Sequence, residues 1–400
     1  MVSLKQLVSV IGLGYVGLPL TVAAANSGYE VVGIDLDEKK VSDINKGEST
    51  IGDIENRKLA GLVKKGKIKA ETNYSSVSRA DIVVICVPTP LLDNHLPDLS
   101  HLESVANSIK SKLSRNSILI LESTVAPGTT RNFLAPLLGF DFEQIEKNFM
   151  VAYSPERIDP MNQEWGIKNT PKIVAGLTEK SKKVASSFYR AFIDKVVQCE
   201  SVEIAETAKL LENSFRFINI SFVNELLVFC QKLGIDVNKV IDAASTKPFG
   251  FMPFYPSIGI GGHCIPVDPL YLAYKAREIG SPTRFIDLAD QINQEMPGYF
   301  VGRAQEKLGG LQKKKILVVG VAYKPDVTDV RETPVTALIS GLKSKGAYVS
   351  WHDDLVKEWN DEKSVDLKTG FDLAIIATPH SYLDLSKLGK TPILDTRGSI

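Results

Sequence analysis

A glycine-spaced turn between an apolar run and a helical stretch is the feature that most constrains this fold. Residues 7–11 have the length and hydrophobicity of a buried strand. Gly12, Gly14 and Gly17 follow in G-x-G-x-x-G spacing, and a helical stretch over about residues 18–26 comes next. Glycine permits a tight turn and a close approach of the backbone to another group. This order of strand, glycine turn and helix is therefore typical of a dinucleotide-binding βαβ unit.

An acidic residue ends the second predicted strand of this unit. The strand covers residues 30–35 and ends at Asp35. A carboxylate at this place accepts hydrogen bonds from the ribose hydroxyls and repels a 2′-phosphate, so we predict NAD rather than NADP as the cofactor. A glycine-rich turn that serves packing alone is the alternative for the glycine pattern by itself.

Further strand patterns continue along the N-terminal half, at residues 81–90, 117–130, 149–158 and 172–177. Strands that alternate with helices indicate a parallel sheet with helices on both faces, and ligands bind beyond the carboxyl ends of such strands. The polar residues at these predicted ends are Thr89, Glu122, Ser123, Thr124 and Glu156. As a set they predict the rim of a site, whereas each alone is equally typical of a helix cap or a turn.

The pattern changes to helices after residue 200. Residues 201–234 show helical spacing of apolar residues without Gly or Pro before the end, which predicts one long helix. Lys209 and Asn213 lie four residues apart and therefore on one face. Lys209 by itself is more typical of a solvated helix surface, and the apolar face suits either the core or a dimer. Shorter helices are predicted over residues 237–245 and 268–279.

Strand patterns return in the last quarter of the chain. A strand, a helix over about residues 334–345 and a strand that reaches His352 are followed by two more candidate strands. Gly320 stands alone in the turn after the first of these strands. We therefore predict a second α/β domain that binds something other than a complete dinucleotide.

These patterns predict an α/β protein with two Rossmann-like doubly wound domains joined by a central helical domain with one long helix. The length of 400 residues, 44% of them hydrophobic, is ample for several cores. The predicted domains are an NAD-binding domain over residues 1–200, a helical domain over 201–303 and a ligand-binding domain over 304–400.

Composition excludes several classes of partner. Lys and Arg together number 47, as do Asp and Glu, so nothing points to nucleic acid or an anionic membrane. No apolar run approaches the roughly 20 residues of a membrane span, and no signal peptide is evident, so we expect the cytoplasm. The four cysteines, Cys86, Cys199, Cys230 and Cys264, form no CxxC pair. We therefore expect neither disulfides nor a bound metal.

The segment "GIGGHCIPVDP", residues 259–269, places a thiol among closely spaced glycines. Glycines this dense mark backbone that turns sharply or approaches another group closely. Backbone N–H groups stabilise a thiolate, which favours a reactive Cys264 over an inert buried one.

Seven segments together resemble the UDP-glucose/GDP-mannose dehydrogenase family over essentially the whole chain. They are "VIGLGYVGLP", "CVPTP", "ESTVAPGTT", "SPERIDP", "AETAKLLENSFR", "GIGGHCIPVDPLYL" and "GVAYKPDVTDVRETP". The segment "TKPFGFMPFYP", residues 246–256, is similar to the branch that oxidises UDP-N-acetylglucosamine. The H-P-R segment of the UDP-N-acetylmannosamine branch is absent from this place.

The resemblance implies a four-electron oxidation of a UDP-sugar at C6, from alcohol to acid, with two NAD molecules used in turn. Cys264 matches the nucleophile that forms a thiohemiacetal and then a thioester. Lys209 and Asn213 match residues that stabilise negative charge on the oxygen at C6. Asp268 and Thr124 match residues that hold a catalytic water, and Glu156 matches a carboxylate used in proton transfer.

The contacts expected on this basis fall into two sets. The predicted NAD contacts are Gly12, Gly14, Tyr15, Val16, Gly17, Asp35, Lys40, Pro88, Thr89, Thr124 and Arg331. The predicted substrate contacts are Glu156, Arg157, Lys209, Asn213, Phe254, Tyr255, Gly261 and Lys324. The resemblance also implies a homodimer through the long helix and a role in supplying precursors for surface polysaccharides or glycans.

Other functions stay open on the sequence alone. The same chemistry with UDP-N-acetylmannosamine or UDP-glucose changes only the substrate. A single-hydride dehydrogenase of the hydroxyacid kind needs no thiol, so Cys264 would be dispensable in it. A nucleotide-sensing binding module would need none of Lys209, Asn213, Cys264 and Asp268.

Overall fold

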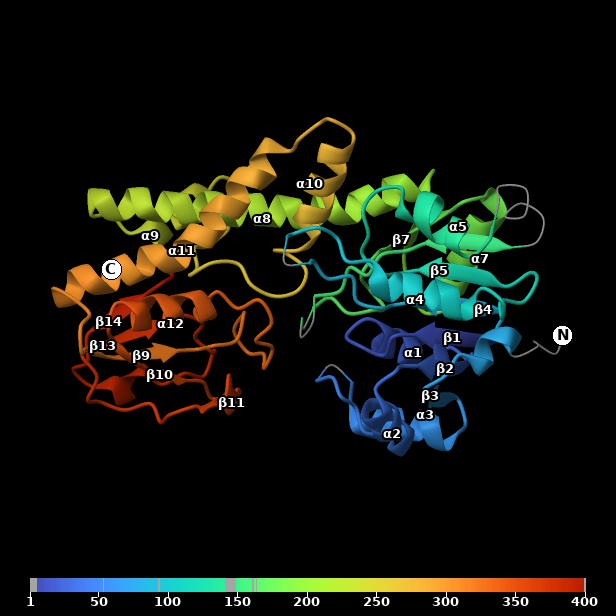
Figure 1. The fold of residues 1–400 in the computed structure, drawn as a ribbon, viewed down its shortest axis with the longest axis horizontal. Coiled ribbons are helices and arrows are strands. Elements are labelled where there is room, and N and C mark those ends of the chain that lie inside the picture. Colours follow the sequence, from blue (N-terminus) through green and yellow to red (C-terminus); the bar gives the residue numbers. More distant parts are fainter. Residues whose placement is uncertain are drawn as a thin grey trace. The chain divides into compact units, whose positions relative to one another are not determined.

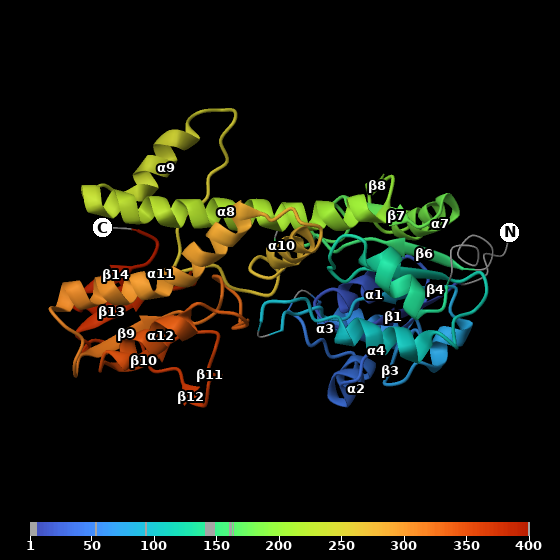
Figure 2. The ribbon, with the colours of Figure 1, turned by 45° about the horizontal axis from the view of Figure 1, so that its top comes forward.

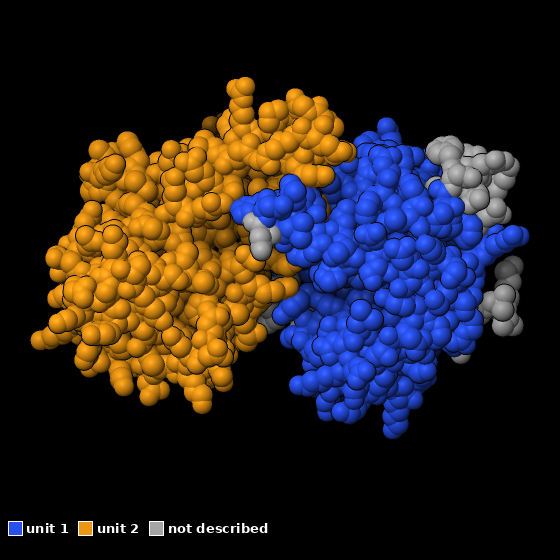
Figure 3. Space-filling view, viewed as in Figure 1, with its two compact units in different colours: residues 1–211 blue, residues 212–400 orange. Residues whose placement is uncertain are grey.

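The computed structural model describes residues 6–52, 54–92, 94–140, 149–159, 162 and 164–398. The chain forms two compact units, Met1–Leu211 and Glu212–Ile400, which Figure 3 distinguishes by colour. The predicted domain boundaries at residues 200 and 303 stay predictions.

The first unit is built on an eight-stranded sheet with the order β3-β2-β1-β4-β5-β6-β7-β8. The strands are β1 Leu7–Ile11, β2 Glu30–Ile34, β3 Ile68–Glu71, β4 Ile82–Ile85, β5 Ile118–Leu121, β6 Met150–Tyr153, β7 Lys172–Gly176 and β8 Val196–Gln198. Figure 1 shows β1, β2 and β4 as neighbouring arrows with the helix α1 beside them. The strand order reverses direction after β1, and ligands bind at such a switch point in open α/β sheets.

Helices cover both faces of this sheet. They are α1 Gly17–Asn26, α2 Glu38–Lys46, α3 Asn56–Lys64, α4 Ser100–Ile109, α5 Ala135–Leu137 and α7 Glu179–Arg190, with short turns of other helix types at Ser75–Arg79 and Thr130–Leu134. Alternate residues of β4 serve two cores: Ile82 and Val84 pack in the core that includes α1 and α7, and Val83 and Ile85 in the core that includes α4. Because both faces are buried, the strands are continuous apolar runs.

The sheet departs from the predicted parallel arrangement at one pair. β6 and β7 are antiparallel, whereas the other paired strands of this sheet are parallel. A parallel pair needs a crossover connection, usually a helix. No helix lies in the described part of the connection between β6 and β7, which agrees with an antiparallel pair.

The long predicted helix is present as α8, Val202–Leu233, with 32 residues. It begins in the first unit and continues into the second. Within the part of the chain that the structure describes, no single helix is long and apolar enough to cross a membrane. The helix α8 passes that test only together with α9, Val237–Ser245, at a bend of 120°.

The second unit joins helices to a smaller sheet. Its helices are α9 Val237–Ser245, α10 Asp268–Glu278, α11 Arg284–Leu308 and α12 Val335–Ser344. The parallel sheet has the order β10-β9-β13-β14, with β9 Lys315–Val319, β10 Tyr348–His352, β13 Leu373–Ile376 and β14 Ile393–Asp395, and a ribbon joins β11 Glu358–Trp359 to β12 Glu362–Lys363. One core contains Leu227 of α8, Phe300 of α11 and Val318 of β9. This shared core makes the helices and the sheet one unit.

The sequence pattern predicts no helix over α11, because Pro297, Gly298 and Gly302 interrupt it. Pro297 lies inside this 25-residue helix, which ends at Gly309 in the left-handed conformation with φ of 65°. In Figure 2, α11 runs alongside α12. Burial of Met296, Phe300 and Val301 against that neighbour outweighs the poor helix propensity of proline.

Buried Glu206 ties the first turns of α8 to the segment that follows β5. Its Oε1 accepts hydrogen bonds from the backbone N–H of Thr130 at 2.9 Å and from the Thr130 hydroxyl at 2.6 Å. Its Oε2 accepts from the N–H of Gly128 at 2.6 Å. Burial raises the pKa of Glu206 to about 7, against the opposing effect of these donors.

Glu206→Gln should lower the free energy of unfolding by about 1–3 kcal/mol near pH 5, because its NH2 group would face the N–H of Gly128 or of Thr130 and cannot accept, whereas both oxygens of a protonated carboxyl keep a lone pair. Because its folded pKa is raised, Glu206 contributes fully to the free energy of unfolding below its unfolded pKa. This contribution is lost as the pH rises through about 7. The deficit of the variant should therefore shrink toward pH 8. Urea unfolding followed by circular dichroism measures both effects.

Glu203→Gln is the matched control. Glu203 lies one turn earlier on α8 and pairs with Arg131 at 2.6 Å, but the two side chains are 35% and 36% exposed. A pair this exposed contributes less than about 1 kcal/mol. Equal losses of unfolding free energy in the two variants would contradict the conclusion that the buried hydrogen bonds of Glu206 stabilise the fold more than the exposed pair of Glu203 does.

Candidate active site

The glycine turn after β1 is fixed by contacts that leave no room for a side chain. A Cβ on Gly12, where φ is +92°, would lie 2.7 Å from the carbonyl oxygen of Cys86 at the end of β4. A Cβ on Gly17 would lie 1.8 Å from the carbonyl oxygen of Gly12. A Cβ on Gly14, in contrast, would meet nothing within 4 Å. Packing thus requires two of the three glycines, and the turn is open at the third.

The N-terminus of α1, which follows this turn, has no capping side chain. Val16 occupies the N-cap position without a side-chain hydrogen bond, and no acidic residue lies in the first turn. The first N–H groups of a helix and its dipole together favour an anion at this place.

Asp35 lies just after β2, beside the turn. Its Oδ2 accepts hydrogen bonds from the N–H of Leu13 and from Lys40 Nζ, both at 2.9 Å, and its Oδ1 accepts from the N–H of Asp37 at 3.1 Å. Burial opposes ionisation, but Lys40 and the N–H donors outweigh it and lower the pKa of Asp35. Asp35 is therefore an anion that also fixes the turn and the start of α2.

The segments after β4 and β5 are tied together by two side chains. The hydroxyl of Thr89 donates to the carbonyl of Thr124, and the hydroxyl of Ser123 donates to the carbonyl of Val87, both at 2.7 Å. The predicted residues Pro88, Thr89 and Thr124 therefore belong to one connected part of the first unit.

Glu156, after β6, is held at both of its oxygens. Its Oε1 accepts from the N–H groups of Arg157 and Ile158 at 2.6 and 2.8 Å, and its Oε2 accepts from Lys172 Nζ at 3.0 Å. The guanidinium of Arg157 donates to the carbonyl of Pro171 at 2.7 Å. Burial raises the pKa of Glu156, but Lys172 and the two N–H donors outweigh it, so the net pKa is lowered.

In the second unit, three of the predicted catalytic residues are linked. The amide of Asn213 donates to Asp268 Oδ2 at 2.5 Å, and both side chains are buried. The N–H of Asp268 donates to the carbonyl of Cys264 at 2.9 Å. Cys264 itself is exposed. Lys209 is buried one helical turn before Asn213, in the part of α8 that belongs to the first unit.

The glycines of the cysteine segment lie directly against the segment that follows β9. A Cβ on Gly261 would lie 2.7 Å from the carbonyl oxygen of Glu332, and one on Gly262 would lie 2.8 Å from the ring of Tyr323. The N–H of Gly262 also donates to the carbonyl of Arg331 at 3.1 Å. The segment that carries the thiol therefore contacts the segment that carries the predicted residues Lys324 and Arg331.

The aromatic residues near residue 250 differ in their surroundings. Phe254 is partly buried and meets Phe215 edge to face at a centroid distance of 5.7 Å. Tyr255 is half exposed and donates to Asp242 on α9 at 3.2 Å. Phe249 and Phe251 are exposed.

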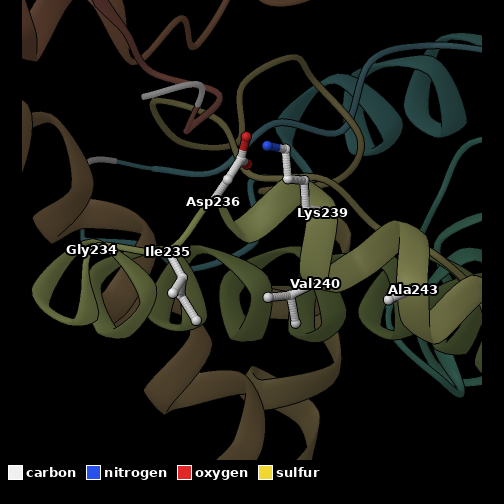
Figure 4. A pocket seen from close by; sticks show the side chains of 6 residues that line it. All are labelled: Gly234, Ile235, Asp236, Lys239, Val240 and Ala243. Atoms are coloured by element: carbon white, nitrogen blue, oxygen red, sulfur yellow. The ribbon is translucent and has the colours of Figure 1, made fainter.

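A surface hollow at the turn between α8 and α9 contains none of the predicted site residues. It is lined by Gly234, Ile235, Asp236, Lys239, Val240 and Ala243 (Figure 4). Among the described residues, no group of three or more His, Cys, Asp and Glu side chains is arranged to hold a metal ion.

Three family models match successive parts of the chain. The NAD binding domain of the UDP-glucose/GDP-mannose dehydrogenase family matches residues 6–193. The central domain of the family matches residues 203–295, and its UDP binding domain matches residues 317–400. The chain belongs to the UDP-glucose/GDP-mannose dehydrogenase family.

Relatives and solved structures agree with this family over nearly the whole chain. A UDP-N-acetyl-D-mannosamine dehydrogenase of Pyrococcus horikoshii is 33% identical over 380 residues, which cover 93% of this chain and 89% of the relative. A UDP-N-acetyl-D-glucosamine 6-dehydrogenase of Pseudomonas aeruginosa is 32% identical over 357 residues, 87% of this chain and 83% of the relative. A solved UDP-D-ManNAc dehydrogenase from Pyrococcus horikoshii matches with a TM-score of 0.90 at 31% identity, covering 98% of this chain and 95% of that one.

This dehydrogenase uses NAD, as the sequence predicted, and the predicted fold class is confirmed. The residues around the first glycine turn fit a dinucleotide. Open space at Gly14 and the uncapped N-terminus of α1 suit a pyrophosphate. The anionic Asp35 suits a ribose. The individual NAD contacts stay predictions.

Sequence reasoning missed one buried cation, Lys172. It is the first residue of β7, and its side chain is 4% exposed. The signal was a lysine beside an apolar run that is typical of a fully buried strand, because a buried lysine needs anionic partners. Glu122 was predicted as a rim residue, and it lies 3.3 Å from Lys172 Nζ.

Gly14→Ala and Gly17→Ala should separate cofactor binding from folding. The added methyl of Gly14→Ala enters open space, so the melting temperature should stay near that of wild type while NAD affinity falls about tenfold or more, a loss of about 1.4 kcal/mol. Gly17→Ala should strongly lower the melting temperature, because its Cβ collides with backbone. Thermal melting and calorimetric NAD titration measure the two effects, and wild-type NAD affinity in Gly14→Ala would contradict the predicted contact.

Proposed function

We propose that this enzyme oxidises UDP-N-acetyl-D-glucosamine at C6 to the uronic acid and forms two NADH per sugar. The observation that carries the proposal is the exposed thiol of Cys264 in a glycine segment linked to buried Asp268 and Asn213. This thiol segment lies against the 320–334 segment of the part matched by the UDP binding domain.

The thiol explains how one enzyme carries out both oxidations. Loss of a hydride and a proton converts the C6 alcohol to an aldehyde. The Cys264 thiolate adds to this aldehyde, and the thiohemiacetal loses a second hydride and proton to become a thioester. Water then cleaves the thioester, which releases the acid and the thiol. Bound NAD supplies the hydride acceptor in each oxidation.

The neighbouring side chains have distinct tasks in this proposal. Lys209 and Asn213 stabilise negative charge on the oxygen at C6. The hydrogen bond from Asn213 to Asp268 fixes the orientation of that amide. Asp268 and Thr124 hold the water, and ionised Glu156 accepts its proton during hydrolysis. The further substrate contacts in this proposal are Arg157, Gly261, Phe254, Tyr255 and Lys324. Arg331 lies on the nicotinamide side.

The choice of sugar rests on residues 246–256. Their aromatic side chains suit the methyl of an acetamido group, and the H-P-R segment typical of the UDP-N-acetylmannosamine branch is absent. UDP-N-acetyl-D-mannosamine is the second candidate, because the Pyrococcus horikoshii relative bears that name. We place the activity in the cytoplasm, in the supply of precursors for surface polysaccharides or glycans.

A stripe of exposed apolar residues along α8 supports a homodimer. The residues are Ile204, Leu211, Phe215, Phe222, Phe229 and Leu233, each between 45% and 61% exposed. Their spacing of seven, four, seven, seven and four follows one face of the helix, in the heptad pattern of helices that pack against each other. Two copies of this stripe would bury each other's apolar surface.

The proposed substrate is tested with UDP-N-acetylglucosamine, UDP-N-acetylmannosamine and UDP-glucose, with NADH measured by absorbance and the sugar product by mass spectrometry. UDP-N-acetylglucosamine should give two NADH per sugar and a kcat/KM at least about tenfold above that for UDP-glucose, since a lost apolar contact costs about 1–3 kcal/mol. A single NADH per sugar would overturn the four-electron reaction. A higher kcat/KM for UDP-N-acetylmannosamine would overturn the epimer alone.

In the same assay, Cys264→Ser should abolish acid formation and leave the affinities for NAD and the UDP-sugar nearly unchanged, because a hydroxyl is a far poorer nucleophile at neutral pH. Cys199→Ser, a change at a cysteine that is partly exposed, serves as the control and should retain activity. Normal acid production by Cys264→Ser would exclude the covalent mechanism.

Phe222→Glu combined with Phe229→Glu should convert the enzyme from a dimer to a monomer of 43.8 kDa, because two charges would enter the apolar stripe of each copy. Light scattering after size-exclusion chromatography measures the mass. Phe285→Glu is the control, since Phe285 is 76% exposed but lies on α11. A monomeric wild type, or a double variant that stays dimeric, would contradict the proposal.

A further inference from the structure

A buried lysine in the first unit joins two carboxylates that follow neighbouring strands. Lys172 Nζ lies 3.0 Å from Glu156 Oε2 and 3.3 Å from Glu122 Oε2. The side chains are 4% exposed for Lys172, 14% for Glu156 and none for Glu122. Charges this deeply buried are costly unless they are paired, so the three side chains act as one electrostatic group.

Tyr189 of α7 contacts both Glu122 and Lys172 of this group. Its hydroxyl donates to Glu122 Oε1, and its ring centroid lies 5.2 Å from Lys172 Nζ. Tyr189 is fully buried. Lys172 is therefore close to a second carboxylate and to an aromatic ring, while it donates to Glu156.

The two carboxylates differ in their tendency to hold a proton. Burial raises the pKa of Glu122 to about 7, with Lys172 acting in the opposite direction. Burial also raises the pKa of Glu156, but there Lys172 and the N–H groups of Arg157 and Ile158 prevail, and the net pKa is lowered. Such a divergence between neighbouring carboxyls marks different roles for them.

We propose that Lys172 is a positioning residue for the reaction, which fixes Oε2 of Glu156 and keeps this carboxylate ionised while Glu122 and Tyr189 hold Lys172 in place. The proposal rests on the proposed function, specifically on Glu156 as the base for thioester hydrolysis. Backbone N–H groups fix the other oxygen, Oε1. Lys172 thus fixes the second oxygen of this base, which its backbone donors hold only at Oε1.

The other titratable groups near Glu156 do not replace this lysine. Cys86 of the β4 end is buried, and its pKa is raised well above its usual value by burial and by Glu122, so it brings no charge. The guanidinium of Arg157 is directed to the carbonyl of Pro171. Among the described residues, loss of Lys172 would leave Glu156 with only its two backbone donors to offset the cost of burial.

Lys172→Met tests the proposal through the pH dependence of kcat with the UDP-sugar and NAD saturating. The acid limb, where Glu156 becomes protonated, should move up by about one pH unit or more, since an opposite charge at this distance shifts a carboxyl pKa by about 1–3 units. KM for the UDP-sugar and for NAD should stay within about twofold. A structural defect alone would lower kcat equally at every pH, and that result would overturn the proposal.

Two further variants keep the test valid if Lys172→Met does not fold. Glu122→Gln combined with Lys172→Met removes one buried anion together with the cation, and should fold and show the same raised acid limb. Lys172→Arg retains a cation, and its acid limb should return toward that of wild type. A wild-type acid limb in the double variant would overturn the proposal.

A control variant and the wild type separate this inference from the proposed function. Lys182→Met removes a lysine of α7 that pairs with exposed Glu179, and its acid limb should match wild type. If wild-type enzyme forms no NADH with any UDP-sugar, the proposed function fails and the role of Lys172 fails with it. If wild type is active and the Lys172 variants keep its acid limb, the role of Lys172 alone fails.

Discussion

Contact between the backbone of a glycine and the end of a neighbouring strand is the constraint on which both α/β sheets depend. In the first unit this contact joins Gly12 to the end of β4. In the second unit a Cβ on Gly320 would lie 1.8 Å from the carbonyl oxygen of Thr378, which follows β13. No other residue type allows the chain to turn so close to the adjacent strand. The turns after β1 and β9 are placed by these contacts.

The second sheet repeats the first but uses its acidic residue differently. Asp353 follows β10 as Asp35 follows β2, and each accepts a hydrogen bond from the second residue after the first strand of its sheet. Asp353 is 1% exposed and also binds His380 and the N–H groups that follow it, which lowers its pKa to about 2. The Asp353 side chain is fully buried, whereas that of Asp35 is 13% exposed, so Asp353 does not supply the ribose contact that is typical of an NAD site. This difference agrees with a match to a UDP binding domain rather than to a second NAD binding domain.

The sequence predicted the features that depend on local pattern and missed those that depend on distant neighbours. The bounds predicted for β1 and α9 agree with the structure, because apolar periodicity and turn residues mark their ends. The antiparallel β7, the proline-containing α11 and the ion pairs of buried Lys172 depend on partners far along the chain. The resemblance named Glu156, but only the structure shows how both of its oxygens are held. Roles at the proposed site stay predictions, because they concern ligands.

The fit of the cysteine segment against Tyr323 has a consequence for engineering. Gly261 and Gly262 match the shape of one particular surface, formed by the Tyr323 ring and the backbone at Glu332. A chimera that exchanges residues 259–269 with those of a relative therefore has to exchange residues 320–334 as well. The two segments lie more than fifty positions apart, yet they form a single steric unit, and transplanting either segment into this scaffold means moving both halves of that unit together.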